Sequence, residues 1–224
     1  MFLEEEIERD KRPFMAVCAP SHNFVLKYFD RLFDMRISDR PEDALPGTTA
    51  FVIRGVDECE NDDARTFRRA CQERGLRIVT LRVPMVIGTG MTGTPMRLAR
   101  GVSRGTMLRI KDNEARWSMI HATDIANVAH LLSQNDDADQ EYVISGALVR
   151  VNDLIEALGQ RIKDKRVGTI SRRLGRIVYG KVLFDLLTTD NVVNPSVFAE
   201  KYPDFEFVNP AEYMKSHVYD DESL

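Results

Sequence analysis

Short apolar runs alternate with segments of helical periodicity along most of this chain. The apolar runs are PFMAVC at 13–18, AFVIRG at 50–55, LRIVTLRVPMVI at 76–87 and EYVIS at 141–145. Between them, residues 22–32 and 62–74 carry apolar side chains at helical spacing, and Gly75 is a typical stop for the second helix. Such alternation is typical of α/β proteins with a mostly parallel sheet. We therefore predict that fold class, with each long apolar run forming one strand.

The second half of the chain continues the pattern and then becomes irregular. Residues 95–104 predict a short helix, and Thr123 and Asp124 are good N-caps for a helix at 125–132. Asn152 or Asp153 is expected to open another helix, and after about residue 160 the pattern is helical and irregular. We predict an α/β domain over residues 13–150. A partly interleaved, helical C-terminal cap region would follow over 151–224.

A glycine-rich turn follows the third apolar run. Gly88, Gly90 and Gly93 match the pattern G-x-G-x-x-G, in which glycines let the backbone approach a pyrophosphate at a helix N-terminus. Asp112 lies 19 residues after Gly93, near the distance at which an acidic residue binds the ribose. Such a fingerprint usually opens its domain, however, whereas at least two predicted strands come earlier here. The match is therefore weak evidence for a dinucleotide site.

Several segments of the chain resemble the extended short-chain dehydrogenases, the NAD-dependent epimerase/dehydratase family. LRVPMVIGTG resembles the family segment LRPxxVYGxG, and RWSMIHATDIANVAHLL resembles the segment R-S-F-V-H-V-D-D-L-A. QEYVISGALVRVNDLIEALG is similar to the strand and helix that follow, while LLTTDNVV and PDFEFVNPAEYMKSHVY are similar to the C-terminal cap. The resemblance covers roughly residues 75–219 in the right order. Several weak motifs in register are more specific than any one of them.

The resemblance implies a Rossmann-like fold, shortened relative to the family, with a small C-terminal cap. It also implies NAD or NADP as cofactor, with Arg82, Pro84 and Val86 beside the cofactor cleft. The glycine turn would then lie on the substrate and nicotinamide side of the site, away from the pyrophosphate. Pro84 has a simpler interpretation as the end of a strand.

The resemblance also implies a site for a small, phosphorylated ligand. Arg116 matches the family arginine that holds the diphosphate of nucleotide-sugar substrates, and a planar guanidinium suits phosphate by bidentate contact. Its alternative role is that of a surface arginine on a strand. His121 can contact a ligand or act as an acid or base, and its alternative role is a half-buried histidine bonded to backbone.

The residues that perform the family's redox chemistry are missing. That chemistry needs a glycine loop after the first strand, but CAPSHNF occupies residues 18–24. It also needs Tyr-x-x-x-Lys on one helix face, where the lysine charge lowers the tyrosine pKa. No lysine lies between Lys27 and Lys111, and no tyrosine between Tyr28 and Tyr142. We therefore assign no catalytic residue.

Two functions follow from this combination of a matching second half and a missing catalytic pair. The first is a ligand-binding or structural protein that kept the fold and lost the redox chemistry. The second is an active NAD(P)-dependent oxidoreductase or epimerase with an altered cofactor loop and a substitute acid. The segment before LRVP is also short, which is explained by loss of one or two βα units.

Composition excludes several other classes. The net charge of −4 gives no general attraction to nucleic acid. Three cysteines without a C-x-x-C pair suit a reducing, cytoplasmic environment, and no run approaches the ~18 apolar residues that span a membrane. The four histidines lack metal-ligand spacing, and no Gly-x-Ser-x-Gly motif suggests a hydrolase. Whether a second copy covers an exposed sheet edge in a homo-oligomer is left open.

One strongly basic segment has no assigned role. Residues 161–176 contain seven basic residues and one acid. The apolar residues that follow at helical spacing can form one stripe: Leu174, Ile177, Val178, Val182 and Leu186. The segment suits an anionic ligand, an anionic membrane surface or a partner groove. The alternative, which the resemblance favours, is a cap helix with a solvated basic face.

Overall fold

The computed structural model describes residues 14–33, 36–44, 47–135, 141–163, 166–210 and 213. The chain divides into two compact units, each assembled from segments that are distant in sequence. The first unit comprises the described residues up to Val83, together with Ala122–Ile144 and Pro195–Pro203. The second comprises Pro84–His121, Ser145–Asn194 and the described residues from Asp204 onward. The domain boundary predicted at residues 150 and 151 falls within the second unit.

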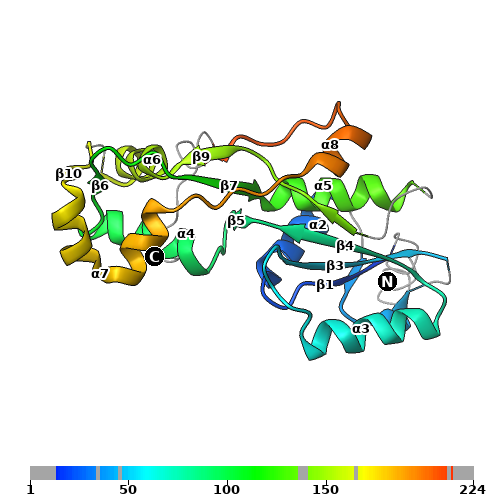
Figure 1. The fold of residues 1–224 in the computed structure, drawn as a ribbon. Coiled ribbons are helices and arrows are strands. Elements are labelled where there is room, and N and C mark those ends of the chain that lie inside the picture. The colour runs from blue at the N-terminus through cyan, green and yellow to red at the C-terminus, as the bar shows by residue number, and fades with distance from the viewer. Residues whose placement is uncertain are drawn as a thin grey trace, which may run out of the picture. The chain divides into compact units, whose positions relative to one another are not determined.

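The first unit is built on a five-stranded sheet of order β2-β1-β3-β4-β8 (Figure 1). Its strands are β1 (Phe14–Cys18), β2 (Arg36–Ser38), β3 (Thr49–Gly55), β4 (Arg77–Val83) and β8 (Glu141–Val143). Every neighbouring pair is parallel. The predicted parallel α/β fold is therefore confirmed. β2 was not predicted, because Arg36–Ser38 lies within residues 36–49, where Pro41, Pro46 and Gly47 predict turns.

Helices cover both faces of this sheet (Figure 1). They are η1 (Asn23–Val25), α2 (Leu26–Phe33), η2 (Pro41–Asp43), α3 (Asp62–Glu73), α5 (Ala122–Ser133) and α8 (Ser196–Lys201). Small strand residues such as Ala16 and Val52 pack with Phe67 and Cys71 of α3 in one buried cluster. Gly75, with φ +68°, follows α3 as predicted, since a left-handed residue after a helix favours glycine.

The described residues of the second unit form two small sheets and several helices. The strands β5 (Met85–Ile87), β7 (Arg116–His121) and β9 (Leu148–Arg150) form one sheet, and β6 (Arg109–Ile110) pairs with β10 (Thr169–Ile170). The helices are α4 (Gly93–Ser103), α6 (Val151–Lys163) and α7 (Arg172–Thr188). β5 runs parallel to β7, whereas β9 is antiparallel to it. Trp117 is buried, and its Nε1 donates to the carbonyl of Thr189 at 3.3 Å, so it belongs to the core.

Three local predictions were wrong. The first is the start of the helix near residue 152, because α6 begins at Val151 and neither Asn152 nor Asp153 opens it. The apolar run 76–87 is not one strand, because it breaks at Pro84 into β4 and β5, which belong to different sheets. Proline cannot donate a ladder hydrogen bond, so it is a natural point for the chain to leave a sheet. Thr123 and Asp124 are not N-caps, since α5 begins at Ala122 directly after β7 and includes both residues in its first turn.

Candidate functional site

The strand order of the first unit locates one candidate site. Open parallel sheets bind ligands outside the carboxyl ends of the strands, at the point where the strand order reverses. Here the order reverses between β1 and β3, since β2 lies on one side of β1 and the later strands on the other. A cavity of about 210 Å³ lies there. Its lining residues are Pro20, Ser21, Val52, Ile53, Arg54, Glu58, Cys59, Glu60, Asn61 and Ala64.

The loop after β1 is closed by its own hydrogen bonds. The backbone N–H of His22 donates to the carbonyl of Ala19 at 3.0 Å, and the N–H of Val25 donates to His22 at 2.9 Å. Pro20 has no N–H group at all. A pyrophosphate cradle needs free backbone N–H groups and glycines that admit close approach. This loop has no glycine and uses at least two of its N–H groups within itself, which agrees with the conclusion drawn from the CAPSHNF sequence.

The loop after β3 folds back on the strand end. A carboxylate oxygen of Glu58 accepts from the N–H of Gly55 at 2.9 Å, and the Glu58 N–H donates to the Gly55 carbonyl at 3.1 Å. The carboxylates of Glu58 and Glu60 both come from residues that line the cavity. Negative charge here opposes the binding of a pyrophosphate. No pattern in the sequence indicated this role for Glu58.

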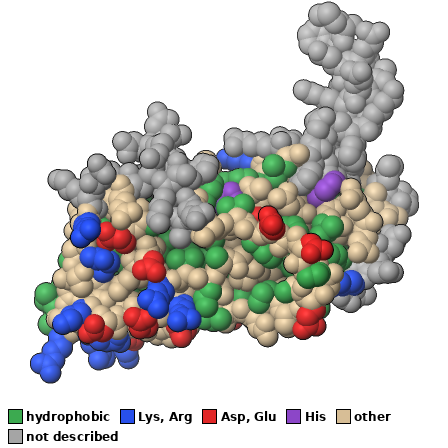
Figure 2. Space-filling model, turned by 90° about the horizontal axis from the view of Figure 1, so that it is seen from above, with side chains coloured by type: hydrophobic (Ala, Val, Ile, Leu, Met, Phe, Trp, Pro, Cys, Tyr) green, Lys and Arg blue, Asp and Glu red, His purple; other side chains and the backbone are tan. Residues whose placement is uncertain are grey.

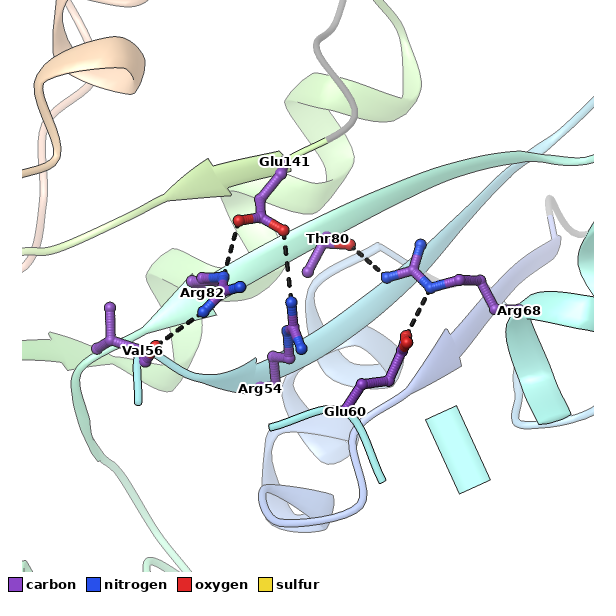
Figure 3. A network of polar contacts seen from close by, with 7 residues as sticks. All are labelled: Arg54, Val56, Glu60, Arg68, Thr80, Arg82 and Glu141. Carbon is purple, nitrogen blue, oxygen red and sulfur yellow. Dashed lines mark hydrogen bonds and ion pairs between the residues drawn. The ribbon is translucent and has the colours of Figure 1, made fainter. Parts of the chain in front are cut away.

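Arginine side chains beside the switch point are held by one carboxylate (Figure 3). Arg82 Nε donates to Glu141 at 2.8 Å, and Arg82 Nη1 donates to the carbonyl of Val56 at 2.9 Å. The other oxygen of Glu141 accepts from Arg54 at 3.5 Å. Arg82, which the resemblance places beside the cofactor cleft, thus makes structural contacts that join β4 to β8 and to the loop after β3.

A second ion pair lies in the same network (Figure 3). Arg68 of α3 donates from Nε to Glu60 at 2.6 Å and from Nη2 to the hydroxyl of Thr80 at 2.8 Å. The hydrogen bond from Arg68 lowers the pKa of Glu60 from its ordinary value, because it stabilises the charged carboxylate. The pair fixes α3 to β4 and does not leave Arg68 available to a ligand.

Cys18 and Cys71 are poorly suited to nucleophilic catalysis. Burial, followed by the charges of nearby acids, raises the pKa of Cys18 to about 11, and burial raises the pKa of Cys71 to about 11. A nucleophilic cysteine needs a lowered pKa. Burial also lowers the pKa of His22, against the charge of Glu58. Across the described ranges, no three His, Cys, Asp or Glu side chains are grouped so that they could hold a metal ion.

A second cavity, of about 340 Å³, lies in the second unit. Its lining residues are Arg116, Ala147, Leu148, Val149, Arg150, Asp153 and Asn209. The antiparallel register of β7 and β9 places Arg116 directly opposite Arg150. Side chains of directly opposite residues share one face of a sheet, with Cβ atoms about 5 Å apart. Two guanidinium groups therefore contribute to one wall of this cavity.

These two arginines have few partners. The backbone N–H of Arg116 donates to Asp190 at 2.8 Å, but its guanidinium forms no ion pair with any residue that the structure describes. Arg150 reaches Glu114 at 3.4 Å, and both of these side chains are largely exposed. Asp153, in the first turn of α6, is the one carboxylate among the residues that line the cavity. The arrangement suits an anion held between two guanidinium groups near a helix N-terminus.

The other residues predicted for the site lie away from this cavity. His121 is five residues from Arg116 on the same strand, so its side chain points to the opposite face. It is buried, and its ring lies 3.9 Å from the ring of Tyr213, centroid to centroid. Val86 is buried and pairs with Ile120. Arg150 was not predicted as a site residue, because no local sequence pattern shows that it pairs with Arg116.

The glycine turn lacks the context of a dinucleotide fingerprint. The turn follows β5, which pairs with β7 in the small sheet of the second unit. Asp112 follows β6, and β6 pairs with β10 instead of with β5. The strand arrangement therefore does not bring an acid beside the strand that precedes the glycines. This supports the interpretation that the turn is not a pyrophosphate loop.

The parallel sheet and its switch point define a Rossmann-like α/β protein. A scan against protein-family profiles finds no match, and a search of curated protein sequences finds none either. Solved structures do resemble the chain. The UDP-N-acetylglucosamine 4-epimerase of Bacillus cereus has a TM-score of 0.59 at 11% identity, over 93% of this chain and 96% of that one.

Two further solved structures are similar to the chain in fold. RMD from Pseudomonas aeruginosa, complexed with NADPH, has a TM-score of 0.58 at 10% identity, over 92% of this chain and 96% of that one. The human epimerase family protein SDR39U1, with NADPH, has a TM-score of 0.57 at 10% identity, over 92% and 99%. At these identities the comparisons establish the fold, and they confirm the Rossmann-like class predicted from the sequence.

Proposed function

We propose that this chain is a divergent relative of the extended short-chain dehydrogenases that binds a phosphorylated small molecule without performing redox catalysis. The observation that carries the proposal is the pair of opposed arginines, Arg116 and Arg150, in an open cavity. The ligand class is a nucleoside diphosphate sugar, because Arg116 matches the family arginine that holds such a diphosphate. The similarity in fold to a UDP-N-acetylglucosamine 4-epimerase is consistent with this class.

The switch point supports the loss of redox chemistry. Its cavity of about 210 Å³ is below the roughly 300–1,000 Å³ of ordinary ligand pockets, and a dinucleotide is a large ligand. The loop after β1 uses the N–H groups of His22 and Val25 internally, and Glu58 adds negative charge. The helix α3, with the sequence DDARTFRRACQE, contains neither tyrosine nor lysine. The small cavity, the loop after β1 and the missing catalytic groups therefore all favour a protein without redox catalysis.

The arginine pair supports a diphosphate ligand. Like charges directly opposite on neighbouring strands repel, and among the described residues only the guanidinium of Arg150 has an acidic partner. A diphosphate placed between the two guanidinium groups removes the repulsion and forms charge-assisted hydrogen bonds with both. Since the cavity is open, the rest of the ligand can extend into solvent or along the protein surface. Asp153 would then face a sugar hydroxyl more favourably than a phosphate.

Calorimetric titration with UDP-N-acetylglucosamine and with inorganic pyrophosphate tests this proposal. We expect the wild type to bind at least one of them, and Arg116→Ala or Arg150→Ala to weaken binding by about 10- to 100-fold, because each removes a charge-assisted contact. Arg104→Ala is the matched control, since Arg104 is exposed in the same unit but does not line the cavity. If Arg116→Ala and Arg150→Ala bind as tightly as Arg104→Ala, the arginine pair does not form the ligand site.

A parallel titration distinguishes the alternative, an active NAD(P)-dependent enzyme. The wild type is examined by thermal shift with NAD, NADH, NADP and NADPH. A ligand at 100 times its dissociation constant adds about 2.7 kcal/mol of stability, which is readily detected. We expect no shift with any of the four. Clear stabilisation by one of them would show that the altered loop still holds a dinucleotide and would favour the enzyme.

A further inference from the structure

The helix α7 is firmly attached to the second unit by one of its faces. It consists of two half-helices that meet at Gly180, whose φ of 69° interrupts the helical geometry. The hydroxyl of Tyr179 accepts from the N–H of Leu108 at 2.6 Å and donates to the carbonyl of the same residue at 2.8 Å. Phe184 and Leu187 are buried. The inner face of α7 therefore already has its apolar and polar partners.

The residues of the apolar stripe predicted from the sequence are exposed, and the break at Gly180 divides them between the two half-helices. All five of its members are exposed: Leu174, Ile177, Val178, Val182 and Leu186. Ile177 is 78% exposed and Val182 is 86% exposed, one in each half-helix. A solvated cap helix would turn these side chains inward and leave polar ones outside. Several large aliphatic side chains exposed on one element are typical of an interaction site.

Basic side chains adjoin the exposed stripe. Leu174, Ile177 and Val178 have the spacing i, i+3, i+4 and share one side of the first half-helix. Arg173 and Arg176 are exposed on the adjoining sector. In the view of Figure 2, Lys and Arg side chains gather at the left, over the second unit, with acidic side chains between them.

We infer that α7 docks on the surface of an anionic lipid bilayer, with its exposed aliphatic side chains entering the headgroup region. A helix that lies in a membrane interface combines an apolar face with Lys and Arg beside it, and α7 has both. Asp185 is the one acidic residue within Arg172–Thr188. No helix among the described residues has the length and apolar character needed to cross a membrane, so the contact is peripheral.

The combination of charges and aliphatic side chains favours an anionic bilayer over nucleic acid as the partner of α7. Nucleic acid would satisfy the arginines but would leave the exposed aliphatic residues in water. An anionic bilayer supplies negative charge and apolar depth together, without requiring a complementary groove. The inference is independent of the ligand proposed for the arginine cavity, since it rests on α7 alone.

Vesicle co-sedimentation of the full chain tests the inference. Vesicles of phosphatidylcholine with phosphatidylserine are compared with vesicles of phosphatidylcholine alone, at low and at high salt. We expect binding to the anionic vesicles only, and weakening by salt. Arg173→Gln and Arg176→Gln should each lower the partition coefficient about fivefold, the effect of one basic residue near an anionic surface. Ile177→Ser with Val182→Ser should lower it by about tenfold or more.

Matched controls separate this contact from other surfaces. Val197→Ser removes an aliphatic side chain that is also exposed but lies on α8, and Arg104→Gln removes a basic residue from the end of α4. Both should bind vesicles like the wild type. Absence of wild-type binding, or binding that Ile177→Ser with Val182→Ser leaves unchanged, would overturn the inference. Sedimentation showing a dimer that the same double variant dissociates would also overturn it, by assigning the stripe to a second copy.

Discussion

Arg116 and Arg150 lie directly opposite each other on the antiparallel strands β7 and β9, and both line one open cavity. Like charges in this position ordinarily destabilise a sheet. Glu114 compensates for Arg150, whereas the guanidinium of Arg116 has no ion pair among the residues that the structure describes. A protein gains nothing in stability from this placement, which is why we interpret it as a site for an anionic ligand.

The first prediction concerns the stability of the unliganded protein. Arg116→Gln should raise its free energy of unfolding by about 0.2–1 kcal/mol at low salt, because it removes the repulsion from Arg150. The gain should shrink at high salt, where the two charges are screened. Urea denaturation at two salt concentrations measures both effects, with Arg104→Gln as the control. A loss of stability in Arg116→Gln would show that the arginine makes favourable contacts within the protein.

The second prediction concerns the carboxylate that joins β3, β4 and β8. Glu141→Gln should lower the free energy of unfolding by about 1–2 kcal/mol, because it leaves Arg54, whose side chain is only 14% exposed, without its counterion. Glu73→Gln is the comparison, since Glu73 pairs with Arg69 on the exposed face of α3. That variant should change stability by no more than about 0.5 kcal/mol. Chemical denaturation of both variants measures the difference, and equal effects would contradict it.

The third prediction concerns a close backbone approach in the second unit. A Cβ added to Gly146 would lie 2.9 Å from the carbonyl oxygen of Met119, which is backbone and cannot move aside cheaply. Gly146→Ala should therefore destabilise the protein by about 1–3 kcal/mol. At Gly168 the nearest atom would be a leucine methyl at 3.5 Å, an ordinary contact. Gly168→Ala should have little effect, and thermal denaturation of the pair tests the contrast.

The fourth prediction concerns thiol reactivity. At pH 8 only about one Cys18 or Cys71 thiol in a thousand is ionised, since both pKa values are raised to about 11 and the thiolate is the reactive form. Cys59 is exposed and lines the switch-point cavity. An aromatic disulfide reagent should therefore modify one thiol rapidly, and Cys59→Ser should abolish this fast phase. Rapid modification of two or more thiols would contradict the burial of Cys18 and Cys71.

The fifth prediction concerns pH. The folded-state pKa of Glu60 is lowered from its ordinary 4.5 by the hydrogen bond from Arg68, so the pair stabilises the fold above that value. The stabilisation is lost as the pH falls below 4.5 and through the lowered pKa. Glu60→Gln should thus be less stable than the wild type at neutral pH, and the difference should vanish in acid. A difference that grows as the pH falls would contradict this sign.

The sequence by itself determined the features that depend on neighbouring residues. The limits of α3, its stop at Gly75 and most of the strands follow from periodicity and turn chemistry, which act within a few residues. The absent glycine loop and Tyr-x-x-x-Lys pair could also be read directly, because a missing residue type needs no coordinates. Motifs in register were sufficient to predict the Rossmann-like class, which the solved structures confirm.

The tertiary structure decided the features that depend on which distant segments meet. Pro84 could be read as the end of a strand, but only the sheets show that β4 and β5 pair with different partners. The spacing of Leu174, Ile177 and Val178 predicted that they share one side of a helix. It could not show whether that side faces the core or the solvent, since burial is set by what packs against the helix. Arg150 became a site residue through its register with Arg116, 34 positions earlier in the chain, and strand pairing over that distance leaves no local pattern.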